Sequence, residues 1–406
     1  MKTMKIALIK ETKTPVDNRV ALSPKEAASL MQMFPGTEIV CQSSDIRAYS
    51  DDEYRAAGIP IVDDVSDCDL LFGIKEAKIS SLLPDKHYVF FGHIAKMQAY
   101  NRPLLQAFLQ KGITFSDYEY MVDEKGIRVC AFGWWAGVVG VYYTLRGYGL
   151  RTGLYELPKP DLRFTLDQLK TNLLAIALPK VKVVLTGGGR VSQGAQYVMK
   201  EIGAQYLPVD EFLAAETVDR LTYTFADADQ LVVPKDASKT FSFPDFFRNP
   251  QDYKSDFFRY AQAADLLICC HFWAPDSPVY LSEEDFLRPG FRIKMIGDVT
   301  CDIMGSVKST LRSSTHDDPY YDYNPVTRAE EPAFSSEKNV TVMAVDTCPH
   351  ALPRDISAYF GEMLIKHVFA PLLRGEHSPV VKGSTIVDRG RLTPKFDYLT
   401  NFAAGK

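Results

Sequence analysis

Long apolar runs are missing from this sequence of 406 residues, and so are the cysteine spacings that hold metal ions. No stretch approaches the ~18 consecutive apolar residues of a membrane-spanning helix. The start MKTMKIALIK leads into a strand-like segment without the apolar centre of a signal peptide. We therefore expect a cytoplasmic protein with no membrane partner.

Cysteine usage points the same way. The seven cysteines are an odd number and form no CxxC pair, which favours reduced thiols over disulfides or a zinc site, so no metal is expected. Cys269 and Cys270 follow the apolar run ADLLI, and we expect them to be buried strand residues.

An excess of positive charge is also absent. The net charge is −5, which gives no reason to expect nucleic acid or an anionic membrane surface as a partner. The length predicts two to three domains, each with enough chain for its own core. A soluble enzyme acting on small molecules fits these properties, and the oligomeric state stays open, with a homo-oligomer among the alternatives.

The most informative segment is VKVVLTGGGRVSQGAQYVMKEIGAQYLPVDEF, residues 181–212. It predicts a buried strand, a glycine turn, a helix starting near Val191 and a second strand ending in the acid Asp210. This order is typical of a dinucleotide-binding unit, in which helix N–H groups face the pyrophosphate and the acid bonds the ribose. The turn glycines are Gly187, Gly188 and Gly189.

The glycine pattern departs from GxGxxG. The third glycine would fall at Ser192, and the next glycine is Gly194, so helix-to-strand packing must use a different geometry. A plain strand-to-helix turn is the alternative interpretation of this segment.

The first 135 residues predict a second doubly wound domain. Short strands are expected at 5–9, 38–41, 69–74, 88–91 and 114–117, with helices between them, one of which is capped by Ser23. Because this domain has no glycine-rich phosphate turn, we expect it to bind the substrate. Residues 131–150 predict a long helix joining the domains. The fold class is thus α/β, with two Rossmann-like doubly wound domains and an interdomain cleft.

Residues 225–262 interrupt the regular pattern, with Phe241, Phe243, Phe246, Phe247, Phe257 and Phe258 among prolines and charges. We interpret this segment as an insertion that caps the cofactor domain. A partner-facing aromatic patch is an equally supported alternative.

Polar side chains follow the apolar strands of the first domain. Lys75 comes after DLLFGI and His93 after HYVFFG, where doubly wound folds place their ligands. Lys96 is one helical turn past His93, and Arg19 lies in the loop after the first strand. A single Lys or His is more often a surface or core group, but repetition at strand ends favours a site. Clustered positive charge would make Lys75 a usable base, and Arg19 could fork onto a carboxylate.

The blocks ETKTPVDNRVALSP, GIKE, FFGHIAKMQAYN, DYEYMVDEKGIRVCAFGWWAG, GGGRVSQGAQ, GDVTCDIMGS and HSPVVKG carry a family resemblance. In this order they resemble the lysine-forming saccharopine dehydrogenases and, most of all, the lysine–2-oxoglutarate reductase half of the aminoadipate semialdehyde synthases. The resemblance covers nearly the whole chain. More distantly, the chain is similar to alanine dehydrogenase and to the nucleotide-binding part of transhydrogenase.

The resemblance implies reversible condensation of lysine with 2-oxoglutarate through an imine that nicotinamide reduces. It implies Lys75 as the base and His93 as the acid. It also implies positions near the substrate or the active-site hydrogen bonds at Arg19, Lys96, Glu76 and Glu119, and the charges of the two glutamates would adjust the pKa values of the pair. Arg128 and Phe132 match a hinge block beside substrate and nicotinamide, and Asp302 matches an aspartate that approaches both. For the weaker positions, such as Arg128, Phe132 and Asp302, an interdomain salt bridge or a core aromatic contact is the alternative.

The segment from about residue 347 resembles the family's return to the first domain. The expected domains are therefore 1–135 plus 347–406 for substrate, and 136–346 for the dinucleotide. Asp210 favours NAD, while Arg190 could compensate a 2′-phosphate, so NAD is predicted and NADP is the alternative. The alternative functions are reductive amination of a small 2-oxo acid with ammonia, and a non-catalytic dinucleotide sensor.

Overall fold

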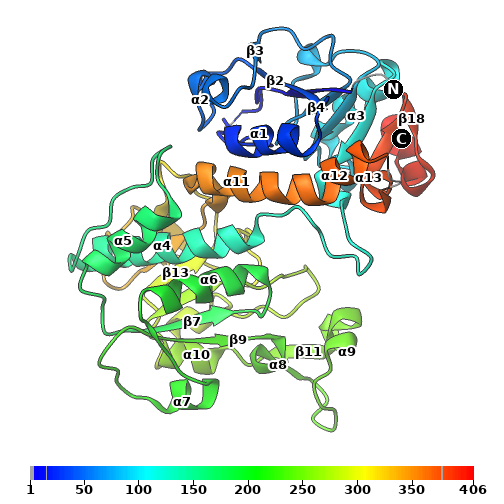
Figure 1. Ribbon diagram of the computed structural model, residues 1–406. Coiled ribbons are helices and arrows are strands. Elements are labelled where there is room, and N and C mark those ends of the chain that lie inside the picture. Colours follow the sequence, from blue (N-terminus) through cyan, green and yellow to red (C-terminus); the bar gives the residue numbers. More distant parts are fainter. Residues whose placement is uncertain (1–3, 15, 376–377) are drawn as a thin grey trace. The chain divides into compact units, whose positions relative to one another are not determined.

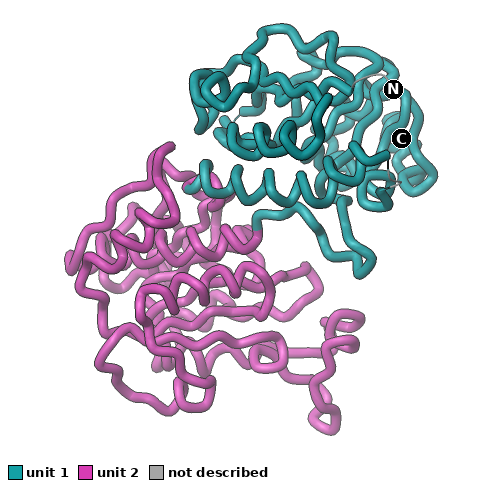
Figure 2. Tube along the Cα trace, in the orientation of Figure 1, with its two compact units in different colours: residues 1–132, 352–406 teal, residues 133–351 magenta. Residues whose placement is uncertain are grey.

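The computed structural model describes residues 4–14, 16–375 and 378–406, which form two compact units. Unit 1 comprises residues 1–132 and 352–406, and unit 2 comprises residues 133–351 (Figure 2). His377, the first residue of the HSPVVKG segment, lies outside the described residues. Among the helices of the described ranges, none has the length and apolar character of a membrane span.

Unit 1 is built on one eight-stranded sheet in the order β18-β17-β6-β5-β4-β1-β2-β3 (Figure 1). The strands from β6 to β3 run parallel, and β17 and β18 add an antiparallel edge. The strands are β1 Lys5–Leu8, β2 Glu38–Gln42, β3 Ile61–Val62, β4 Leu70–Phe72, β5 His87–Phe90, β6 Thr114–Asp117, β17 Thr385–Asp388 and β18 Arg391–Leu392.

Helices from both ends of the chain pack against this sheet. Ser23 caps α1 through its side chain, which accepts from the Glu26 amide, as predicted. The helices are α1 Pro24–Met33, α2 Asp51–Ala56, α3 Arg102–Gln110, α11 Pro353–Leu364, α12 Ala370–Leu373, α13 Pro379–Ser384 and α14 Thr400–Ala403, with a π-helical turn at Ile365–Phe369.

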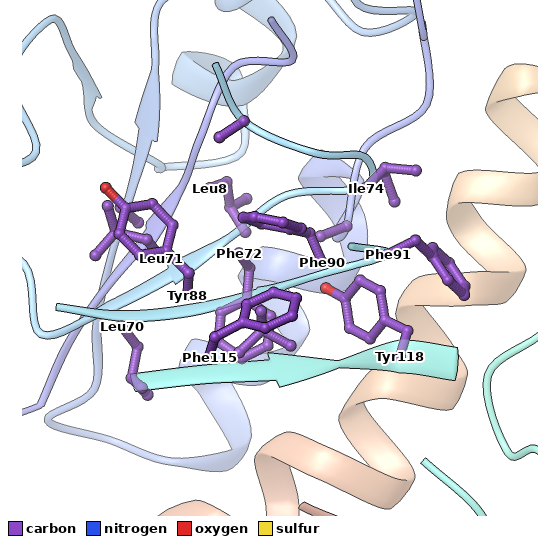
Figure 3. Packing of buried hydrophobic residues seen from close by; sticks show 14 of the residues in the cluster. Leu8, Leu70, Leu71, Phe72, Ile74, Tyr88, Phe90, Phe91, Phe115 and Tyr118 are labelled. Atoms are coloured by element: carbon purple, nitrogen blue, oxygen red, sulfur yellow. The ribbon is translucent and has the colours of Figure 1, made fainter. Parts of the chain in front are cut away.

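An aromatic core supports the strands of unit 1 (Figure 3). The Phe90 and Phe115 rings lie 4.8 Å apart on neighbouring strands, and the Phe91 and Tyr118 rings lie 5.1 Å apart just past those strands. Burial of such large apolar rings is the main favourable contribution to folding and gives the strand ends a rigid base.

Unit 2 has a second eight-stranded sheet in the order β15-β14-β16-β13-β12-β7-β9-β8. The strands from β16 to β8 are parallel, and β14 and β15 are antiparallel. The strands are β7 Lys182–Thr186, β8 Gln205–Tyr206, β9 Thr222–Ala226, β12 Leu266–Cys269, β13 Met295–Asp298, β14 Tyr320–Asn324, β15 Ala329–Glu331 and β16 Val340–Met343. The predicted α/β class with two doubly wound sheets is confirmed.

The helices of unit 2 include the long apolar helix predicted for residues 131–150, which spans 133–152 as α4. Cys269 and Cys270 are buried at the end of β12, as expected. The helices are α4 Gly133–Thr152, α5 Leu166–Ala175, α6 Arg190–Glu201, α7 Val209–Ala214, α8 Ala228–Leu231, α9 Phe243–Arg248 and α10 Phe258–Ala263.

The phenylalanine-rich segment forms a small hairpin with its own helix. β10 Val232–Pro234 and β11 Tyr253–Ser255 pair antiparallel, and α9 lies between them in sequence. Phe246 and Tyr253 join the core of unit 2, with their ring centroids 5.2 Å apart. Phe247 is 72% exposed, so only part of this aromatic cluster belongs to the core.

Candidate active site

The two residues predicted to form an acid–base pair lie side by side in unit 1. Lys75 is three residues past the end of β4, and His93 is three residues past the end of β5. Because β4 and β5 are neighbouring parallel strands, these positions meet at one edge of the sheet. The Lys75 Nζ and His93 Nε2 atoms are 3.5 Å apart.

The loop that carries His93 has an unusual backbone. His93 has a left-handed conformation with φ of 52°, which a residue other than glycine rarely adopts. The preceding Gly92 has no room for a side chain, because a Cβ there would lie 2.5 Å from the Phe115 ring. Strained backbone of this kind persists where the surrounding structure holds it, and it is concentrated at functional sites.

Glu119 is the centre of an ionic network beside His93. Its carboxylate lies 3.5 Å from His93 Nδ1, 2.9 Å from Lys96 Nζ and 3.4 Å from an Arg128 guanidinium nitrogen. Burial alone would raise the pKa of Glu119, but hydrogen bonds from His93 and Lys96, together with nearby positive charge, lower it to about 2. Glu119 is therefore an anion at neutral pH.

Lys75 has the electrostatic surroundings of a base. Burial is the largest cause that lowers the pKa of its ammonium group, and the positive charge of Arg19 lowers this pKa further. The carboxylates of Asp17 and Glu76 raise it. Glu76 itself forms an ion pair with Lys13 at 2.7 Å. Burial is thus a larger cause of the lowered Lys75 pKa than the clustered positive charge on which the prediction rested.

Arg19 is held by Asp17, a residue that was not predicted to belong to the site. Asp17 accepts from Arg19 Nε at 2.9 Å and from a terminal nitrogen at 2.6 Å, and both side chains are buried. The guanidinium carbon also lies 4.3 Å from the centre of the Phe132 ring. Because the Asp17 carboxylate occupies one edge of the Arg19 guanidinium, a substrate carboxylate would have to bind at the other edge.

Unit 2 carries the predicted glycine turn between β7 and α6. Gly187 has φ of +87°, and a Cβ there would lie 2.8 Å from the His271 Cα atom. A Cβ at Gly188 would collide with the Asp227 carboxylate. At Gly189, by contrast, a Cβ would meet nothing within 4 Å, so this position opens onto free space.

The start of α6 suits an anion. Gly189 is its N-cap and provides no side-chain hydrogen bond, and α6 continues from Arg190 and Val191 for 12 residues. Amides at such a helix start, together with the helix dipole, bind phosphate groups. The turn therefore fits the pyrophosphate of a dinucleotide.

The missing third glycine of the fingerprint has a structural explanation. A Cβ at Gly194 would collide with the Trp134 carbonyl, and one at Gly137 with the Val191 carbonyl. Gly194 therefore permits close packing of α6 on α4, a helix–helix contact.

The prediction that the second strand ends in Asp210 is wrong. β8 ends at Tyr206, and Asp210 lies exposed in the first turn of α7. The strand beside β7 is β9, and it is followed directly by Asp227. Since the ribose acid of a dinucleotide unit ends the strand next to the glycine turn, Asp227 takes the place of Asp210 as the candidate.

Two further groups lie at the strand ends of unit 2. Asp302 lies in the loop after β13, and burial raises the pKa of its carboxyl group. His271, which was not predicted, is hydrogen-bonded to Thr186 at 2.6 Å and to Ser306 at 2.8 Å. Burial lowers the pKa of His271 to about 3, so the imidazole is uncharged at neutral pH. The His271 backbone lies against Gly187 of the glycine turn.

Comparison with known proteins shows which families the chain is similar to. Residues 7–139 match the family described as alanine dehydrogenase/PNT, N-terminal domain. The predicted family resemblance is confirmed.

The chain is 28% identical to an alpha-aminoadipic semialdehyde synthase of Arabidopsis thaliana, an alignment that covers 97% of this chain and 41% of that protein. It is 27% identical to the mitochondrial alpha-aminoadipic semialdehyde synthase of Bos taurus, with 97% and 47% covered. The chain thus spans less than half the length of these relatives. It is 24% identical to the NAD(+), L-lysine-forming saccharopine dehydrogenase of Candida glabrata, with 87% and 88% covered.

Solved structures show the same fold. An L-alanine dehydrogenase superimposes with a TM-score of 0.66 at 19% identity, over 98% of this chain and 100% of that chain. A transhydrogenase from Sinorhizobium meliloti does so with a TM-score of 0.57 at 14% identity, over 96% and 98%.

Proposed function

We propose that the chain is a nicotinamide-dependent amino-acid dehydrogenase that condenses L-lysine with 2-oxoglutarate and reduces the imine to saccharopine. The observation that carries the proposal is the Lys75–His93 pair, with 3.5 Å between Nζ and Nε2. The name of the Candida glabrata relative, an L-lysine-forming saccharopine dehydrogenase, supports lysine and saccharopine as reactants. The pair also favours a catalyst over a dinucleotide sensor, which needs the glycine turn alone.

The two side chains match the two proton transfers that imine formation requires. The attacking amine must first lose a proton, and the hydroxyl of the resulting carbinolamine must gain one before it leaves as water. Lys75, whose pKa is lowered by burial and by Arg19, is the acceptor of the first proton. His93, held between Lys75 and Glu119, is the donor of the second.

The charges around the pair suit a substrate with carboxylates. The side chains of Lys96 and Arg128 are 49% and 40% exposed, so both present positive charge to solvent beside Glu119. Guanidinium and ammonium groups of this kind recognise carboxylates through charge-assisted hydrogen bonds. We assign 2-oxoglutarate to this side of the site.

The glycine turn would hold the cofactor pyrophosphate, with Gly189 and the amides of α6 facing it. A bound nicotinamide supplies the hydride for the reduction. Asp227 would bond the adenosine ribose and repel a 2′-phosphate, so we propose NAD as the cofactor and NADP as the alternative.

A second candidate is reductive amination of a small 2-oxo acid with ammonia. It is favoured by the match of residues 7–139 to the alanine dehydrogenase/PNT family and by the fold shared with L-alanine dehydrogenase.

One assay separates the candidates. Oxidation of NADH and NADPH by purified protein is followed with 2-oxoglutarate plus lysine, with 2-oxoglutarate plus ammonia, and with pyruvate plus ammonia. We expect turnover with lysine and 2-oxoglutarate. Turnover only with ammonia would support the second candidate, and cofactor binding without any turnover would point to a sensor.

A further inference from the structure

Carboxylates hold the main chain of both loops that carry the proposed acid–base pair. Glu11, three residues past β1, accepts from the Ile74 amide at 2.6 Å and from the Lys75 amide at 2.9 Å, one with each carboxylate oxygen. The neighbouring Gly73 leaves room for this carboxylate, because a Cβ there would lie 3.2 Å from Glu11 Oε1. The backbone of the Lys75 loop is thus fixed at two consecutive amides.

Asp117 does the same for the other loop. It is the last residue of β6 and is fully buried. Its carboxylate accepts from the Gly92 amide at 3.1 Å and from the Glu119 amide at 2.9 Å. One side chain therefore ties the residue before His93 to the residue that forms the ionic network beside it.

We propose that Glu11 and Asp117 are positioning residues, which hold the Lys75 and His93 loops so that the two side chains stay within reach of one reacting centre. This inference rests on the function proposed above. The left-handed backbone at His93 makes the second tie the more important, because a strained conformation persists only when its surroundings hold it.

Each carboxyl group holds its two amides at a cost in stability. Burial raises the pKa of Glu11 to about 8 and that of Asp117 to about 6. An acid whose pKa is raised by folding makes the folded state less stable above the pH at which it ionises in the unfolded chain. Glutamine or asparagine has only one acceptor oxygen, so a carboxyl group is needed to hold two amides at once, one with each oxygen. This two-point tie is what fixes each loop.

The test compares Glu11→Gln and Asp117→Asn with a matched control, Asp69→Asn. Asp69 also accepts from a main-chain amide, that of Lys5 at 3.1 Å, but it precedes β4 and lies at the opposite end of the sheet. Steady-state kinetics are measured with lysine, 2-oxoglutarate and NADH. We expect at least a tenfold loss of kcat/KM in both test variants, unchanged NADH affinity, and parental values in the control.

A second measurement does not depend on turnover. The rate at which acetic anhydride modifies Lys75 is followed against pH by mass spectrometry of its peptide. If Glu11→Gln releases the loop, Lys75 moves away from its buried place beside Arg19, and its apparent titration midpoint shifts upward by at least half a pH unit. The control should leave the midpoint unchanged.

The outcomes separate the two proposals. A parent protein inactive with lysine and 2-oxoglutarate would refute the proposed function, yet the labelling of Lys75 would still decide the role of Glu11. Glu11→Gln that matches the parent in both kinetics and labelling overturns the inference. If Glu11→Gln fails to fold, Gly73→Ala provides a milder displacement of the same carboxylate and is judged by the same two measurements.

Discussion

Lys75 Nζ lies 3.5 Å from His93 Nε2, although the two residues are separated by 18 positions in the chain. The register explains why: β4 and β5 pair in parallel, with Phe72 opposite Val89, so its continuation brings Lys75 level with Gly92, the residue next to His93. The rings of Phe90 and Phe115 lie 4.8 Å apart in the core of these strands (Figure 3). The pair is thus a product of sheet topology, and each member can be tested separately.

Lys75→Met should lower turnover by about 100-fold or more, the usual contribution of a general acid–base group. Methionine has similar length and no titratable group, so folding and cofactor binding should be retained. The measurement is kcat alongside thermal unfolding. Lys78→Met, at an exposed neighbouring position, serves as control.

His93→Gln should reduce turnover to a similar degree and remove one limb of the pH–rate profile, because the two residues handle different protons. Parental turnover in both His93→Gln and Lys75→Met would mean that the pair is structural. Thermal unfolding is measured for both variants, and only a variant that folds like the parent is used to judge the role of its residue.

Gly189→Val should weaken binding of the nicotinamide cofactor at least tenfold, about 1.4 kcal/mol, while leaving the fold intact. A side chain at Gly189 meets no protein atom within 4 Å, and φ of −79° is accessible to valine. The space it fills is therefore the space assigned to the pyrophosphate. Titration calorimetry measures the effect, with Lys200→Val near the other end of α6 as control. Equal affinity in a folded Gly189→Val variant would rule out the phosphate site.

The strands and the glycine turn were predictable because their signals are local. Buried parallel strands are short apolar runs, and the glycine turn at 187–189 can be recognised from the residues next to it in the chain. The edge strands β17 and β18 were missed because β17 pairs with β6, almost 270 residues earlier in the chain, and β18 pairs in turn with β17.

The ribose acid was misplaced for a related reason. A spacing of about 20 residues identifies the acid only when the second strand in sequence is also the neighbour of the first in the sheet. Here β8 lies at the edge and β9 is inserted beside β7, so Asp227 occupies the expected place. Glu11 and Asp117 were missed because they bond main-chain amides, which have no side-chain signature in the sequence.

Asp227→Asn should weaken NADH binding and improve the ratio of kcat/KM for NADPH over NADH, because removal of the charge relieves repulsion of a 2′-phosphate. Asp210→Asn should leave both values unchanged, since Asp210 is exposed in α7. Kinetics with both cofactors measure the effect. If Asp210→Asn alters the cofactor preference and Asp227→Asn does not, then Asp210 is the acid that bonds the ribose, and the assignment to Asp227 is wrong.

Glu119→Gln should destabilise the protein at neutral pH, and the destabilisation should shrink in acid. Folding lowers the pKa of Glu119 to about 2 from its ordinary value of 4.5, so the ionised group stabilises the folded state above the unfolded-state pKa. This stabilisation is lost as the pH falls toward the folded-state pKa. Urea unfolding at pH 6.5, 5 and 3.5 should therefore show a falling difference between parent and variant. Glu124→Gln, at an exposed position five residues away, should show none, and a pH-independent difference for Glu119→Gln would mean that its effect comes from packing.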